Sequence, residues 1–361
     1  MAEKISANRT VTPNGAKKSL RKGIKIKRPV FMWGPPGIGK SDIVHQIGAE
    51  QNREVIDIRL SLWEPTDIKG IPYYNSTLNT MCWAPPTELP TDPNSTAILF
   101  LDELNSAAPA TQAAAYQLVL NRRVGTYILP KGVAIIAAGN RETDKGVTYR
   151  MPAPLSNRFL HLELTTDFED WLNWATNNLI HGQVVGYLGF ARQDLYNFDP
   201  KSPSRSFATP RSWTFVSDLL NDDDLEDETL MDLVSGAIGE GLAHKFMAHR
   251  KVAKQMPNPE DILYGKITKC SIKEISAMYS LGISMCYELK NAADKKIKNW
   301  DTMADYFFRF LMDNFPTELT VMSAKIALTN YNLPFDASKL KNFDEFHDKY
   351  GKYILTAMEI A

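Results

Sequence analysis

Residues 29–43 read PVFMWGPPGIGKSDI. The apolar residues before the first glycine predict a short buried strand, and the spacing of Ile43 and Ile47 predicts a helix that begins near Lys40. Between the two, residues 34–41 match the pattern G-x-x-x-x-G-K-[ST]. Glycines in such a turn let backbone N–H groups face a phosphate, and the helix N-terminus adds its positive dipole end. The stretch therefore predicts a phosphate-binding loop on an α/β sheet.

The loop predicts a site for ATP and Mg²⁺. The Lys40 ammonium is expected to reach the β- and γ-phosphates, and the Ser41 hydroxyl is expected to take one coordination position of Mg²⁺. The residues expected to surround the nucleotide are Gly34, Pro35, Pro36, Gly37, Ile38, Gly39, Lys40, Ser41 and Asp42.

Two further motifs follow at the ends of apolar runs. The run TAILFL at 96–101 ends at Asp102 and Glu103. At the end of a strand, Asp102 can hold Mg²⁺ directly or through water, and Glu103 can polarise the attacking water as a general base. The run VAIIAAG ends at Asn140, whose amide would lie beside that strand and orient the water. Taken alone, an Asn at such a place is more often a turn former.

Strand-like and helix-like segments alternate through the first half of the chain, which predicts a parallel, doubly wound α/β sheet of five strands. The expected strands are 29–33, 54–60, 96–101, 133–138 and 161–164.

Two stretches, 65–90 and 123–129, lie outside this alternation and are expected to be insertions, where partners often bind. In the first insertion the aromatic residues Tyr73, Tyr74 and Trp83 either grip a polypeptide or pack under their own loop.

Beyond residue 167 the strand pattern stops and helical spacing takes over. The expected parts are a flexible polar and basic arm at 1–23, an α/β nucleotide-binding core at 24–166, an α-helical lid at 167–265 and a helical C-terminal region at 266–361. The basic cluster at 17–28 is interpreted as a solvated face or, alternatively, as a contact for nucleic acid.

Composition narrows the class of protein. The 361 residues include 44% hydrophobic and 23% charged residues, which exclude a disordered or fibrous chain. The formal net charge is −1, so no overall field draws the chain to nucleic acid or to a membrane. No apolar run approaches the roughly 20 residues of a membrane span. The cysteines Cys82, Cys270 and Cys286 have no metal-ligand spacing and suit a reducing compartment. A soluble, cytoplasmic protein is expected.

In their order and spacing the motifs resemble those of AAA+ ATPases and, among these, of the MoxR branch. The resemblance runs from about residue 29 to 263. It rests on the blocks WGPPGIGKS, LWEPTDIKGIP, LFLDELNSAAPATQAAAYQLVLNRRVG, AAGNRETD, PLSNRF and ATPRSW. No motif of the family maps onto the N-terminal arm or onto the residues after about 266.

The resemblance implies catalytic roles for three residues. Asn140 takes the place of sensor 1, and Arg211 in the Thr-Pro-Arg block takes that of sensor 2. Arg158 takes the place of the arginine finger, which reaches the γ-phosphate held by a neighbouring subunit. On the residues alone, Arg158 could instead cap its helix or pair with Glu163, and Arg211 could pair with Asp218 or another carboxylate of the lid.

The resemblance also implies a ring motor that remodels a protein. The insertions at 65–90 and 123–129 match the family's helix-two insert and its hairpin before sensor 1, which line or crown the pore. The implied partners are further copies of the chain, in a ring expected to be hexameric, and a von Willebrand factor A domain protein or another protein client. The alternative is a nucleic-acid motor or clamp-loader-like ATPase, supported only by the basic arm; near-neutral charge makes nucleic acid the less expected partner. Arg141 and Arg150 each have two possible roles: a structural ion pair, or a second cation that acts across the interface.

Overall fold

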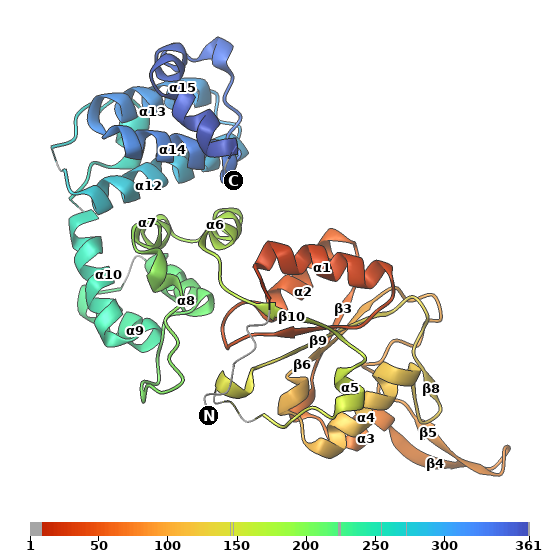
Figure 1. The fold of residues 1–361 in the computed structure, drawn as a ribbon. Helices are drawn as coiled ribbons and strands as arrows, with labels where there is room; N and C mark the ends of the chain where they lie inside the picture. The colour runs from red at the N-terminus through yellow and green to blue at the C-terminus, as the bar shows by residue number, and fades with distance from the viewer. Residues whose placement is uncertain are drawn as a thin grey trace. The chain divides into compact units, whose positions relative to one another are not determined.

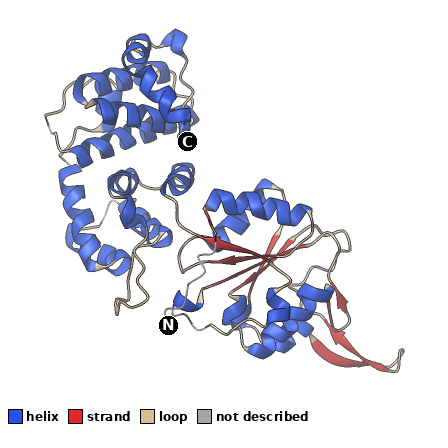
Figure 2. Ribbon diagram, viewed as in Figure 1, coloured by secondary structure: helices blue, strands red, loops and turns tan. Residues whose placement is uncertain are grey.

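The computed structural model describes residues 9–359 apart from 145, 147, 223, 224, 254 and 272, with side chains as far as residue 353. The chain divides into two compact units, Met1–Asp167 and Phe168–Ala361. The first unit combines strands and helices, and the described part of the second is helical (Figures 1 and 2). The division lies next to the boundary that the sequence suggested between core and lid.

The first unit is built on one parallel sheet in the order β1-β10-β2-β9-β6-β3. Its strands are β1 (Thr10–Val11), β2 (Val30–Trp33), β3 (Val55–Arg59), β6 (Ile98–Asp102), β9 (Ala134–Gly139) and β10 (Leu160–Leu164). The five expected strands are confirmed. The expected number is wrong by one, because β1 adds a sixth strand through the pairs Thr10↔Glu163 and Val11↔Leu164.

Helices cover both faces of this sheet, because alternate residues of each buried strand point to opposite sides (Figure 1). The helices of one face are α1 (Pro13–Lys25) and α2 (Lys40–Glu50), and those of the other are α3 (Pro65–Lys69), α4 (Pro109–Asn121) and α5 (Ala153–Ser156). Met32 of β2 packs with the first group, whereas its neighbour Phe31 packs with the second.

The helix α1 lies where the sequence analysis placed a flexible arm. Its residues Ala16, Leu20 and Ile24, spaced four apart, are buried against the sheet. Thr12 caps the helix, since its hydroxyl accepts a hydrogen bond of 3.2 Å from the backbone N–H of Gly15. The expectation of a loose arm is therefore wrong for this helix; residues 1–8 of the expected arm lie outside the described residues.

The two insertions form antiparallel hairpins that contact each other. The first is β4 (Ile71–Asn75) with β5 (Thr80–Ala84), and the second is β7 (Arg123–Val124) with β8 (Tyr127–Ile128). The Trp83 ring packs so closely on Gly125 that a Cβ there would lie 3.2 Å from it, and the Thr126 hydroxyl donates to the Trp83 carbonyl at 2.8 Å. The hairpins therefore support each other through Trp83.

The second unit shares one apolar core from Phe168 to Phe346. Its helices are α6 (Phe168–Asn177), α7 (Gly182–Phe190), α8 (Pro210–Leu220), α9 (Asp227–Ile238), α10 (Glu240–Ala253), α11 (Pro259–Leu263), α12 (Ile275–Asp294), α13 (Trp300–Asn314), α14 (Thr317–Thr329) and α15 (Phe343–Glu359). The expected division of this part at residue 266 is therefore absent from its packing. None of the described helices is long and apolar enough to cross a membrane.

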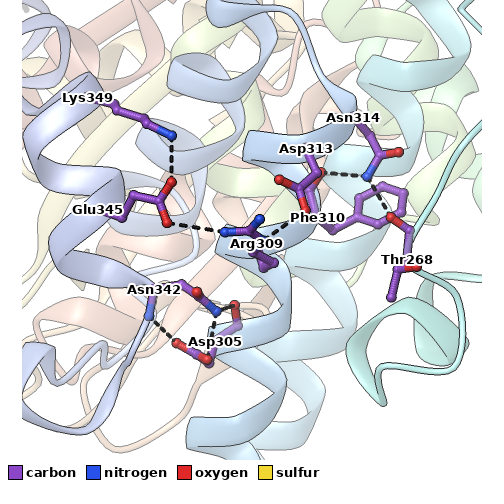
Figure 3. Close-up of polar contacts among 9 residues, drawn as sticks. All are labelled: Thr268, Asp305, Arg309, Phe310, Asp313, Asn314, Asn342, Glu345 and Lys349. Atoms are coloured by element: carbon purple, nitrogen blue, oxygen red, sulfur yellow. Dashed lines mark hydrogen bonds and ion pairs between the residues drawn. The ribbon is translucent and has the colours of Figure 1, made fainter.

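Polar contacts of α13 hold the last helices together (Figure 3). Asp305 accepts hydrogen bonds from the backbone N–H and the side-chain amide of Asn342, at 2.7 and 2.8 Å. At the other end of α13, the Asn314 amide donates to the carbonyl of Thr268 at 3.0 Å. These contacts join the helices of the C-terminal region to one another, and the shared apolar core joins that region to the expected lid.

Candidate active site

The site lies at the edge of the sheet where β2, β9 and β6 end. These strands are parallel neighbours, so the residues that follow each of them meet at one edge. The loop 34–41 follows β2, Asp102 ends β6, and Asn140 follows β9. The structure thus brings together the three motifs that the sequence singled out.

The loop presents backbone N–H groups at the start of α2. Gly37 and Gly39 have φ of +73° and +93°, a left-handed conformation that suits glycine. No side chain of the described residues caps α2, so its first N–H groups are available to an anion. Ile38 is buried in the core beneath the loop, whereas Asp42 is exposed in the first turn of the helix. The loop has the backbone shape of a phosphate cradle.

Lys40 links the loop to the neighbouring strand. Its Nζ donates hydrogen bonds to the carbonyls of Gly34 and Pro35, at 2.7 and 3.0 Å. It also donates to Oδ1 of Asn140 at 2.9 Å. The ammonium therefore lies between the loop and the end of β9, and its three donors are directed by three acceptors.

Ser41 and Asp102 form a pair of oxygen ligands suited to Mg²⁺. The Ser41 hydroxyl donates to Oδ2 of Asp102 at 2.9 Å, and Oδ1 of Asp102 accepts from the backbone N–H of Glu103 at 2.9 Å. The described residues contain no cluster of three His, Cys, Asp or Glu side chains that would hold a metal alone. One carboxylate and one hydroxyl fit Mg²⁺, which takes its other ligands from phosphates and water.

Glu103 is held in an unusual backbone conformation with both carboxylate oxygens engaged. Its φ is +54°, uncommon for a residue with a side chain. Oε2 accepts a hydrogen bond from the Ser61 hydroxyl, and Oε1 lies 3.8 Å from Nε of Arg59. Neither Ser61 nor Arg59 belongs to a motif of the sequence. Arg59 ends β3 and Ser61 follows it, and both reach Glu103 because β3 pairs with β6 in the register Arg59↔Asp102, which the sequence does not indicate.

Asn105 is a second residue that sequence reasoning missed. Its Nδ2 donates to the carbonyl of Asn140 at 2.7 Å, and its side chain is almost fully buried. A Cβ at Gly139 would lie 2.0 Å from Oδ1 of Asn105, so only glycine fits before Asn140. Asn105 thus fixes the backbone that carries the expected sensor residue.

Asp57 on β3 is a second carboxylate near Asp102. Burial raises the pKa of Asp57, and the negative charge of Asp102 raises that pKa further. His45 lies 3.5 Å from Asp57 and acts in the opposite direction. The accumulated negative charge is an environment in which a bound cation is favoured.

Arg158 lies away from these residues. It precedes β10, whereas the loop, Asp102 and Asn140 follow their strands, so Arg158 belongs to the opposite edge of the sheet. It is exposed and forms no ion pair with a described residue. The alternative partner Glu163 pairs instead with Arg141, at 3.6 Å.

The other three arginines considered in the sequence, Arg141, Arg150 and Arg211, differ in whether they form ion pairs. Arg141 also lies 3.2 Å from Asp144, which supports a structural pair. Arg150 and Arg211 are exposed and form no ion pair with a described residue. Arg211 is in the first turn of α8, after the capping residue Thr209, in the second unit of the chain.

Comparison with known proteins supports this assignment of the core. Residues 29–161 match the ATPase family associated with various cellular activities (AAA). The matched residues include the strands β2, β3, β6 and β9 of the parallel sheet and the three motifs that follow β2, β6 and β9. A comparison with curated proteins gave no match.

The chain is also similar to several solved structures, at low identity and low TM-score. A presumed ATPase from Cytophaga hutchinsonii is 14% identical, with a TM-score of 0.33, covering 66% of this chain and 90% of that one. A RuvB mutant from Thermotoga maritima is 16% identical, with a TM-score of 0.39, covering 82% and 86%. A second RuvB mutant is 16% identical, with a TM-score of 0.37, covering 83% and 86%. Likenesses of this size assign no activity or partner to this chain.

Proposed function

We propose that the chain is an ATP-hydrolysing ring motor of the MoxR type that remodels or activates a protein partner. The observation that carries the proposal is the meeting of Lys40, Asp102 and Glu103 at one sheet edge, with Asn140 bonded to Lys40. A phosphate cradle, an oxygen pair for Mg²⁺ and a carboxylate base are the parts that ATP hydrolysis needs. Release of phosphate from ATP by the purified chain tests it; ATP binding without release would contradict it.

Each residue has a separate task in this mechanism. Lys40 exchanges its present acceptors for oxygens of the β- and γ-phosphates, while the N–H groups at the start of α2 hold the phosphate chain. Ser41 and Asp102 would hold Mg²⁺, which neutralises phosphate charge when it is bound. A carboxylate oxygen of Glu103 accepts the proton of the attacking water, which Asn140 helps to orient.

The position of Arg158 supports action across an interface. Because it lies at the sheet edge opposite to Lys40 and Asp102, it does not belong to the site of its own chain. A guanidinium that is exposed and has no ion pair to a described residue can reach the phosphate bound by a neighbouring copy. This geometry supports a ring, which the resemblance to MoxR-type ATPases suggests is hexameric.

The first hairpin supports a protein as the client. No charged residue occurs from Gly70 to Pro86, and the side chains of Ile71, Tyr74 and Met81 are 72%, 66% and 62% exposed. An exposed, uncharged apolar surface of this kind is typical of a protein interaction site. We propose that it contacts a polypeptide, with a von Willebrand factor A domain protein as the leading partner on the resemblance.

Replacing Tyr73 and Tyr74 with Ala should leave the melting temperature and basal ATPase nearly unchanged, because both rings are largely exposed. The same variant should lose most of the ATPase stimulation by casein, used as an unfolded polypeptide probe. Trp83→Ala is the matched control: its half-buried ring packs on Gly125, so its removal should weaken the contact between the two hairpins and lower the stability by about 1–3 kcal/mol, less than for a fully buried Trp. A double variant that melts early, or that casein still stimulates fully, would contradict the assignment.

A second candidate, binding of nucleic acid, is favoured by one observation. Residues 9–28 contain eight basic residues and no acidic one. Lys17 and Arg21 pair with Glu50, but Lys18, Lys22 and Lys25 form an exposed stripe on α1 opposite its buried face. A basic stripe along a helix is a typical footprint for phosphates.

Changing Lys18, Lys22 and Lys25 to Glu tests this candidate. If the stripe binds a phosphate backbone, the variant should lose at least about tenfold in affinity for labelled duplex DNA at low salt, and the salt dependence should become less steep. The control is the same change at the exposed Lys295, Lys296 and Lys298 of the second unit. Equal binding by both variants, or no binding by the unmodified chain, would leave the stripe as a solvated face.

A further inference from the structure

Four rings form a cluster on one face of the sheet. Phe31 and Trp33 belong to β2, and Phe159 and His161 lie at the start of β10. They share a face because the parallel register places His161 beside Phe31. The ring centroids of Phe31 and Trp33 are 4.3 Å apart, those of Phe31 and Phe159 are 5.5 Å apart, and the rings of Trp33 and His161 are stacked at 6.0 Å.

Two hydrogen bonds in this cluster have determined donors and acceptors. The indole N–H of Trp33 donates to Nδ1 of His161 at 2.8 Å. An indole nitrogen only donates, so Nδ1 carries no proton and Nε2 carries the proton of the neutral ring. Nε2 lies 2.8 Å from the carbonyl of Ser156, to which it donates. Trp33, His161 and Ser156 are therefore joined in one chain of hydrogen bonds.

The two ends of this hydrogen-bonded series lie in different parts of the proposed machinery. Trp33 directly precedes Gly34, whose carbonyl accepts a hydrogen bond from Lys40. At the other end, Ser156 closes the turn that presents Arg158, since its carbonyl also accepts from the N–H of Phe159 at 3.2 Å. The hydrogen bonds thus connect the phosphate loop with the opposite edge of the sheet.

We propose that Trp33 and His161 are positioning residues that tie the placement of Arg158 to the conformation of the phosphate loop in the same chain. The inference rests on the proposed function, in which Arg158 acts on ATP bound by a neighbouring copy. A movement of Gly34 displaces Trp33, the residue before it. The hydrogen bonds from Trp33 to His161 and from His161 to Ser156 then displace the turn at Ser156. In a ring, each site then influences the next one through a single chain.

The test uses mixed assemblies in which only one kind of interface is active. The donor subunit carries Glu103→Gln, so its own site is silent but its Arg158 is present. The acceptor carries Arg158→Ala, so its site is intact but it lends no arginine. Hydrolysis then reports how well the donor's Arg158 serves the acceptor's site.

Adding Trp33→Phe to the donor keeps an aromatic ring and removes the N–H. If Trp33 positions Arg158, kcat of the mixture should fall by about threefold to tenfold, as expected for one lost orienting hydrogen bond. The KM for ATP should stay unchanged, because the acceptor's own phosphate loop is untouched. The donor's melting temperature should also stay within the range of its control, Trp63→Phe, which packs on the same core.

A second donor variant, His161→Phe, keeps the stacked ring and removes both hydrogen bonds. It should reduce kcat to a similar extent, and the double variant should reduce it no further, since both changes break one connection. Unchanged kcat with both donors would overturn the coupling while leaving the proposed function intact. No hydrolysis by the unmodified donor and acceptor mixture, with assembly verified, would overturn the action of Arg158 in trans and the coupling with it.

Discussion

Glu103→Gln is expected to bind ATP with nearly unchanged affinity and to hydrolyse it at least about 10²-fold more slowly than the unmodified chain. The amide keeps the size of the side chain, and its oxygen still accepts a hydrogen bond from Ser61. It cannot take the proton of the attacking water, however, so only the chemical step is lost. Phosphate release under saturating ATP and the Kd of a fluorescent ATP analogue separate the two effects.

Lys40→Ala should give the opposite pattern. Lys40 contacts phosphate already in the bound state, so its removal should weaken ATP binding itself, visible as a large rise in the Kd. Ser61→Ala is the matched control for Glu103, because it removes the hydrogen bond from the turn after β3 and keeps the carboxylate. If Glu103→Gln hydrolyses ATP as fast as the unmodified chain, Glu103 is not the base. If Ser61→Ala is as slow as Glu103→Gln, the loss of activity comes from a displaced carboxylate and not from the loss of a base.

The central residues of the site could be predicted because each belongs to, or directly follows, a recognisable pattern in the sequence. The loop between β2 and α2 is one continuous motif, and Asp102 and Asn140 directly follow apolar runs. In a parallel sheet such strand ends meet at one edge, so proximity follows from order alone. The Lys40–Asn140 hydrogen bond joins two of these motifs.

Contacts that depend on the register of neighbouring strands were not predictable. Ser61 reaches Glu103 only because Arg59 pairs with Asp102, and Trp33 reaches His161 only because β2 and β10 are adjacent. The strand β1 is two residues long, too short for a periodic pattern. The sequence of α1 resembles a polar arm because its basic residues outnumber the three apolar residues that are buried.

Arg158→Ala is expected to bind ATP almost normally and to hydrolyse it about 10³–10⁵-fold more slowly, the usual effect of removing an arginine that acts in trans. The reason is its place in the fold: it precedes β10 at the edge opposite to Lys40, so it adds nothing to binding in its own chain. The matched control is Lys131→Ala, an exposed cation just before β9. Steady-state kcat with the Kd for ATP, measured on assembled protein, checks the prediction.

Mixing is the decisive part of this experiment. Arg158→Ala subunits retain a complete ATP site, and Lys40→Ala subunits retain Arg158, so each is inactive alone for a different reason. In mixed assemblies some interfaces combine the intact site of the first with the arginine of the second, and a fraction of the hydrolysis should return. The fraction should rise and fall with the mixing ratio, because it depends on how often unlike subunits are neighbours. If assembly is verified and no ratio restores turnover, Arg158 does not act between subunits, and its isolation at the opposite edge needs another explanation.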